Sequence, residues 1–169
     1  MEILAATTED EVAATFRRAE LQSPRFREEV LAGTRGWRIG GLFDGLPDDI
    51  DWFRVALEPA EVLALRYIDW DWWLCISGGM RSPVDAAERI RAGLVPDADA
   101  ESELPLAARL RSDDPPPELI AVTTGAGEPP VVIEGHVRLT AYALHAEFLP
   151  ARLEILLGIS PRAREWCNY

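Results

Sequence analysis

Two short apolar runs in the last third of the chain constrain its fold most. Residues 119–122 (Leu-Ile-Ala-Val) and 131–133 (Val-Val-Ile) have the length and the β-branched content of buried strands. The segment between them, residues 125–129 (Gly-Ala-Gly-Glu-Pro), predicts a hairpin-like turn. A third strand is expected at residues 153–157, ended by Gly158. The last third therefore predicts most of a sheet.

The rest of the chain supplies helices and one more strand. A length of 169 residues suits a single domain with a real core. The expected elements are helices at 8–32, 83–92, 101–111 and 138–145, a helical turn from Pro59 and a strand at 53–57. This order predicts an α/β (α+β) domain with a mixed sheet. Residues 51–169 form that domain, and residues 1–50 form an N-terminal helical extension within one compact unit.

Residues 68–76 are the most hydrophobic stretch of the chain and contain three of its six tryptophans. Asp69 and Asp71 alternate with apolar side chains, which favours a strand with one wet face. We leave three roles open for this aromatic cluster. The cluster could pack in the core, form a stacking platform for a base, or engage a protein partner or a second copy of the chain.

The charge of the chain narrows the classes of partner. A net charge of −12 argues against a nucleic-acid binder and against an anionic membrane surface. All 17 basic residues are arginine, a pattern that we interpret as a bacterial-like, genomic composition bias. Without lysine there is no Schiff base and no Walker-type lysine, so a phosphate would be held by arginine, by backbone N–H groups or by a metal.

The cysteines and the N-terminus predict a cytoplasmic protein. Cys75 and Cys167 lie far apart in the sequence and lack CxxC spacing, so a zinc site is not expected and buried, inert thiols are. Residues 1–4 have no basic region and no long apolar run. No stretch approaches the length of a membrane-spanning helix.

A glycine-containing loop offers a first candidate anion site. It leads into the helix expected at 83–92, and a flexible backbone at a helix N-terminus suits an anion. The alternative is a plain turn before the helix. The candidate ligand-binding residues here are Ser77, Gly78, Gly79, Arg81 and Ser82, the last of which also predicts the helix cap.

The second and stronger candidate follows the strand at 131–133. Glu134 at the strand end suits a general base or a metal ligand, and Gly135 opens a turn that exposes N–H groups. His136 suits proton transfer, and Arg138 in the first helical turn can bind phosphate oxygens in a bidentate manner. Thr140 adds a hydroxyl. A purely structural role, in which these side chains pin a tight turn, remains an alternative.

Residues 131–142 (Val-Val-Ile-Glu-Gly-His-Val-Arg-Leu-Thr-Ala-Tyr) resemble the signature of the ParB/sulfiredoxin-like superfamily, and the resemblance covers about residues 50–160. Glu134, Gly135, His136 and Arg138 match the signature by position. The resemblance implies a small α/β fold with a nucleotide or phosphate pocket. Members include a CTP-dependent DNA-partition switch, ATP-dependent sulfinic acid reductases, free-serine kinases and nuclease-like proteins.

Two departures refine what the resemblance implies. The turn has no cysteine, so sulfinic acid reduction is not expected, and Val137 replaces the second charged residue of the partition branch. We therefore expect a nucleotide- or phosphate-binding domain, a phosphotransferase or NTP hydrolase, with a nucleoside triphosphate and Mg²⁺ as ligands. A non-catalytic protein-interaction module is the alternative, and a nuclease-like role ranks last. His145 is expected to be half-buried and structural.

Overall fold

A computed structural model describes residues 1–95, 118–125 and 127–169; the helix expected at 101–111 lies outside this part of the chain. Five strands form one mixed sheet in the order β1-β2-β5-β3-β4. All neighbouring strands are antiparallel except β3 and β5, which are parallel. The strands are β1 (Glu2–Thr7), β2 (Asp51–Leu57), β3 (Leu119–Thr123), β4 (Val131–Glu134) and β5 (Leu153–Ile159).

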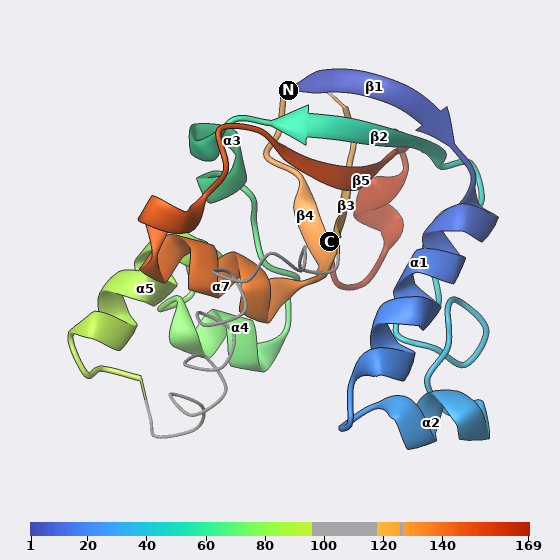
Figure 1. Ribbon diagram of the computed structural model, residues 1–169, viewed down its shortest axis with the longest axis horizontal. Helices are drawn as coiled ribbons and strands as arrows, with labels where there is room; N and C mark the ends of the chain where they lie inside the picture. The colour runs from blue at the N-terminus through green and yellow to red at the C-terminus, as the bar shows by residue number, and fades with distance from the viewer. Residues whose placement is uncertain (96–117, 126) are drawn as a thin grey trace.

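Helices cover both faces of this sheet (Figure 1). The α-helices are α1 (Glu9–Gln22), α2 (Arg27–Ala32), α3 (Pro59–Leu63), α4 (Asp71–Ile76), α5 (Pro83–Arg91) and α7 (His136–Leu144). Short 3₁₀ turns follow at Ala146–Phe148 and Ala163–Glu165. The α/β class with a mixed sheet is thus confirmed, as are the strands and helices expected at 53–57, 119–122, 131–133 and 83–92.

The sheet has one hydrophobic core on each face. On one face, Leu65, Leu139 and Leu157 are part of a core to which α3, α5 and α7 contribute. On the other face, Phe16 of α1 packs with Phe43 of the following loop. Each face therefore has its own set of covering helices.

The N-terminal residues join the sheet as well as covering it. Thr8 caps α1 in a capping box with Glu11, at the start of the helical range expected from residue 8. The strand β1 that precedes it is paired with β2 and was not expected. Its side chains are almost all exposed, because β1 is an edge strand. Such a strand lacks the buried, alternating pattern by which strands are recognised.

The structure overturns three sequence-based expectations. Residues 68–76 are not a strand, because Asp71 begins the short helix α4 and places Trp73 and Ile76 against the core. Gly158 does not end the last strand but lies within β5, where an added Cβ would come within 2.6 Å of an Ile50 methyl carbon. The thiols of Cys75 and Cys167 are exposed rather than buried, and neither forms a disulfide.

In the described residues, none of the helices is sufficiently long and apolar to cross a bilayer.

Candidate functional site

The candidate site lies where β4 ends and α7 begins. Gly135 occupies this turn with φ +99°, a left-handed conformation that favours glycine. A Cβ here would lie 2.4 Å from Leu119 Cδ2 and 2.8 Å from Arg138 Nη1. No side chain caps this end of the helix. The turn thus requires glycine and leaves the first N–H groups of α7 without a side-chain partner.

The guanidinium group of Arg138 folds back beneath this turn. Its side chain is buried, and its Nη1 donates a hydrogen bond of 3.2 Å to the backbone oxygen of Glu118. Its buried Nε has no hydrogen-bond partner among the described residues. A buried polar atom without a partner costs free energy, so this N–H is available to an acceptor.

His136 is fixed by ring stacking. Its imidazole lies on the indole of Trp73, with ring centroids 4.8 Å apart and ring planes 17° apart, and Trp73 also stacks on Tyr67. Burial lowers the pKa of His136 to about 3, although a hydrogen bond to the Val132 carbonyl opposes the shift. The histidine is therefore neutral at physiological pH, and its Nε2 has no partner in the described part of the chain.

Glu134 shares a row across the sheet with Arg54. The row runs from Arg54 through Leu156 and Ile120 to Glu134, each paired with the next on neighbouring strands. The register shifts between Ile120 and Ala121, which turns Glu134 to the face covered by α1, where Glu20 is its charged neighbour. Burial raises the pKa of its carboxyl group, the negative charge of Glu20 adds to the shift, and the charge of Arg138 opposes it.

Glu20 is a neighbour of the motif that the sequence does not reveal. It lies on α1 with only 5% of its surface exposed, and it forms an ion pair with Arg35. The guanidinium of Arg35 also lies over the ring of Phe26, at 3.7 Å from the ring centroid. A buried carboxylate on the core-facing stripe of α1 is a signal that could have been noticed, but its proximity to Glu134 depends on the tertiary fold.

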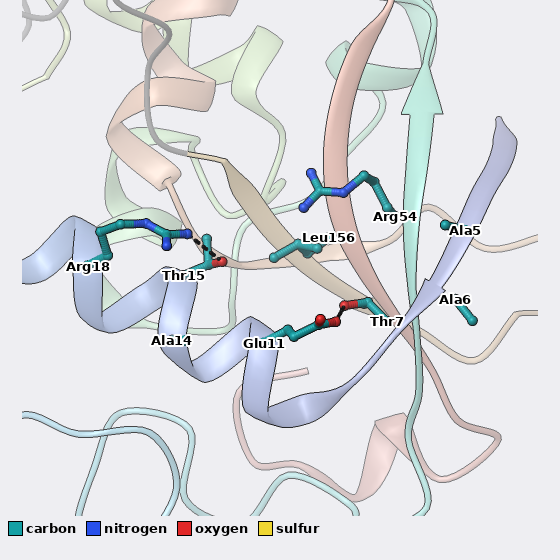
Figure 2. Close-up of a pocket in the computed structure, with 9 residues that line it drawn as sticks. All are labelled: Ala5, Ala6, Thr7, Glu11, Ala14, Thr15, Arg18, Arg54 and Leu156. Atoms are coloured by element: carbon teal, nitrogen blue, oxygen red, sulfur yellow. Dashed lines mark hydrogen bonds between the residues drawn. The ribbon is translucent and has the colours of Figure 1, made fainter.

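A cleft of about 350 Å³ lies between α1 and the sheet, on the same face as Glu134 (Figure 2). The guanidinium groups of Arg18 and Arg54 extend from opposite sides of it (Figure 2). Arg54 forms an ion pair with Glu118, the residue whose backbone oxygen binds Arg138. Glu118 thus joins the cleft to the motif, because its carboxylate pairs with Arg54 and its backbone oxygen accepts a hydrogen bond from Arg138. The cleft is lined by Ala5, Ala6, Thr7, Glu11, Ala14, Thr15, Arg18, Arg54 and Leu156.

The glycine-containing loop between α4 and α5 is held by its own contacts. Ser82 caps α5, as predicted, by accepting a bond of 3.2 Å from the Asp85 N–H. Ser77 donates to the Trp73 carbonyl at 2.6 Å. Arg81 donates to the carbonyls of Tyr67 and Tyr169, and its buried Nη2 has no partner among the described residues.

The loop's glycines fit a structural role too. Gly78 and Gly79 have φ values of +64° and +85°, so both supply backbone conformations that favour glycine. An added Cβ at Gly78 would lie 3.3 Å from the Arg89 side chain, whose Nε donates to the Ile76 carbonyl. The loop is therefore a tightly bonded connection between two helices.

Thr140 and His145 also have local partners. The Thr140 hydroxyl bonds the Tyr67 hydroxyl at 2.7 Å and donates to the His136 carbonyl at 2.9 Å. His145 is half-buried and packs beside Phe148, as expected of a structural histidine. In the tryptophan-rich segment, Trp70 is the most exposed ring, with 51% of its surface accessible.

The side chains that could coordinate a metal ion at the junction of β4 and α7 suit only a loosely held ion. Among the residues that the structure describes, no group of three or more His, Cys, Asp or Glu side chains could hold an ion. Glu134 would supply a single carboxylate. That fits a Mg²⁺ ion bound chiefly by phosphate oxygens, the usual arrangement for magnesium nucleotides.

Comparison with protein-family models, curated proteins and solved structures finds no match to this chain.

Proposed function

We propose that this chain binds a small phosphorylated ligand, such as a nucleotide, at the junction between β4 and α7, and that it acts there as a phosphotransferase or NTP hydrolase. The likeness of residues 131–142 to the ParB/sulfiredoxin-like signature favours this function. The proposed ParB/sulfiredoxin-like fold is consistent with the mixed sheet and with the place of the motif at a strand end.

The buried, unpartnered Nε of Arg138 beneath the uncapped N-terminus of α7 is the observation that carries the proposal. The N–H groups of a first helical turn and the positive end of the helix dipole attract an anion. A guanidinium adds charge-assisted hydrogen bonds to phosphate oxygens. A phosphate group bound here would give Arg138 Nε the acceptor that it lacks.

The cleft under α1 supports a ligand larger than free phosphate. Its volume of about 350 Å³ suits the organic part of a small molecule. Its edge at Leu156 is two strands away from Glu134 in the sheet, about 10 Å at the usual spacing. Arg18 and Arg54 would offer further donors to a ligand in the cleft.

Glu134 is the proposed proton acceptor. A carboxyl group whose pKa is raised by burial titrates closer to neutral pH, which suits a general base. His136 is neutral, so its proposed role is a hydrogen bond through Nε2 rather than a positive charge. Mg²⁺ carried by the phosphates would neutralise part of their negative charge.

The test is a thermal-shift titration with pyrophosphate, ATP, CTP and GTP, each with and without Mg²⁺. A ligand that binds the native state raises its melting temperature by mass action. We expect a rise for the wild type and its loss in Arg138→Gln, which keeps a polar side chain but removes the guanidinium. Arg164→Gln is the matched control, because Arg164 is exposed and pairs with Glu128.

Two results would contradict the proposal. One is the absence of a shift with every ligand, and the other is a shift that Arg138→Gln leaves unchanged. Should Arg138→Gln fold poorly, Arg138→Lys keeps the positive charge and is expected to bind pyrophosphate more weakly than the wild type, because lysine cannot bind phosphate in a bidentate manner.

A further inference from the structure

A second concave surface lies on the outside of the α1–α2 pair. It is a groove of about 560 Å³ with an apolar floor of Ala14, Leu21 and Leu31 and a rim of Arg17, Arg18 and Arg27. Leu31 is 65% exposed. The two helices lie side by side at one edge of the molecule, apart from α3, α5 and α7 (Figure 1). The groove therefore belongs to the N-terminal helices and not to the motif at α7.

The rim arginines are unneutralised. Among the described residues, the side chains of Arg17 and Arg27 form no ion pair or hydrogen bond, and the Arg18 guanidinium donates only to the Thr15 hydroxyl. Their acidic neighbours are engaged elsewhere, since Glu20 forms an ion pair with Arg35 and Glu29 lies 4.0 Å from the same guanidinium. No acidic side chain lines the groove.

This local positive charge contrasts with the rest of the protein. The chain carries a net charge of −12, and the exposed Arg152, Arg162 and Arg164 are each paired with a carboxylate. The unpaired guanidinium groups of Arg17 and Arg27 beside the exposed Leu31 complement a ligand that presents carboxylates and apolar side chains together. A helix with acidic residues flanking one apolar stripe has this composition and fits a groove along another helix.

We propose that this arginine-rimmed groove is a docking surface for an acidic amphipathic helix of a partner protein. The leucines accept the apolar stripe of the partner helix, and Arg17 and Arg27 bind the carboxylates beside it. A phosphate alone is not the expected occupant, because the floor is apolar. A second copy of this chain is disfavoured by repulsion between two molecules of the same high negative charge.

The experiment selects peptides for binding to the full-length chain. The probe is a displayed library of random peptides about 15 residues long, roughly four helical turns. Selected peptides are labelled, and their binding is measured by fluorescence anisotropy. We expect enrichment of sequences with Asp or Glu flanking apolar residues at i, i+3 and i+4 spacing, and affinity that weakens with added salt.

A double variant and a charge-matched control locate the site. Arg17→Glu/Arg27→Glu is expected to weaken binding by at least about tenfold. Arg152→Glu/Arg164→Glu makes the same change in net charge at other exposed positions and is expected to leave affinity nearly unchanged. Leu31→Gln, at an exposed position, is a second variant that tests the apolar floor without altering charge.

Three outcomes would overturn the proposal. The selected peptides could lack acidic residues, or both double variants could weaken binding equally, which would indicate a general charge effect. Light scattering could instead show a wild-type dimer that Arg17→Glu/Arg27→Glu dissociates, and the groove would then be an interface between copies of the chain.

Discussion

The imidazole of His136 stacks on the indole of Trp73, with ring centroids 4.8 Å apart and ring planes 17° apart. This contact joins the first residue of α7 to the tryptophan-rich segment that forms α4. Two features that are more than sixty positions apart in sequence are therefore one structural unit. Because the ring of His136 is held from one face, its Nε2 has a defined position next to the turn at Gly135.

Gly135→Ala is expected to lower the free energy of unfolding by about 2–4 kcal/mol, since it combines backbone strain with a steric clash. The Cβ would meet Leu119 and Arg138 side-chain atoms at 2.4 and 2.8 Å. Urea denaturation measures the change. Gly127→Ala is the control, because Gly127 has φ +76° but open space around it, so only the strain of about 1 kcal/mol is expected. Equal losses in the two variants would refute the clash.

Acid should destabilise the protein through His136. Its pKa is lowered from 6.5 to about 3 in the folded state, so below pH 6.5 the unfolded chain binds a proton that the folded chain does not. The contribution of His136 to the stability of the folded state is fully present above pH 6.5 and is lost as the pH falls toward 3. Between pH 7 and pH 5 it removes about 2 kcal/mol of stability, at 1.36 kcal/mol per pH unit.

The variant His136→Phe isolates the contribution of His136 to the pH dependence of stability, because phenylalanine keeps a ring on Trp73 without a titrating nitrogen. The difference in unfolding free energy between pH 7 and pH 5 should be smaller in the variant by about that 2 kcal/mol. Glu134 contributes in the opposite direction, since its raised pKa gives stability that is lost as pH rises, and it is present in both proteins. An identical pH dependence in wild type and variant would mean that His136 protonates freely in the folded state.

Arg81→Ala is expected to cost about 3 kcal/mol or more of stability, because a buried cation loses hydrogen bonds to two backbone carbonyls. One of these anchors the C-terminal Tyr169 to the core. Arg89→Ala, which loses one bond of 3.2 Å to the Ile76 carbonyl, serves as the comparison and should cost less. If Arg81 contacts phosphate instead, its variant will lose the pyrophosphate-induced thermal shift as well as stability.

Glu134→Gln tests the proposed reaction separately from binding. The amide keeps the size of the carboxyl group but cannot accept a proton, so nucleotide turnover should be abolished while the pyrophosphate-induced thermal shift persists. Glu118→Gln is the matched control, since its carboxylate pairs with Arg54 and its backbone oxygen, which binds Arg138, is unchanged. Turnover that survives in Glu134→Gln would exclude this residue as the base.

Several local features could be predicted because nearby residues determine them. Thr8 and Ser82 cap helices through bonds to N–H groups three positions ahead. The apolar, β-branched run at 131–133 forms a strand, and the glycine after it makes the turn into α7. The strand, turn and helix around residues 134–138 could be predicted for the same reason, because they are consecutive in sequence.

Features that depend on distant residues could not be predicted. The edge strand β1 is exposed, so its pairing with β2 leaves no hydrophobic pattern in the sequence. The alternation at 68–76 suited a strand, but packing of Trp73 and Ile76 against the core favours a helix.

The sequence by itself determined the caps, the turn at Gly135 and the main sheet-forming runs, because hydrogen bonds and steric limits between near neighbours fix them. Only the tertiary structure decided that Glu20 lies near Glu134, that Glu118 bonds both Arg54 and Arg138, and that Arg17 and Arg27 flank an apolar groove without partners. These relationships join separate elements, and their charges and distances are set by how the two layers of helices pack on the sheet.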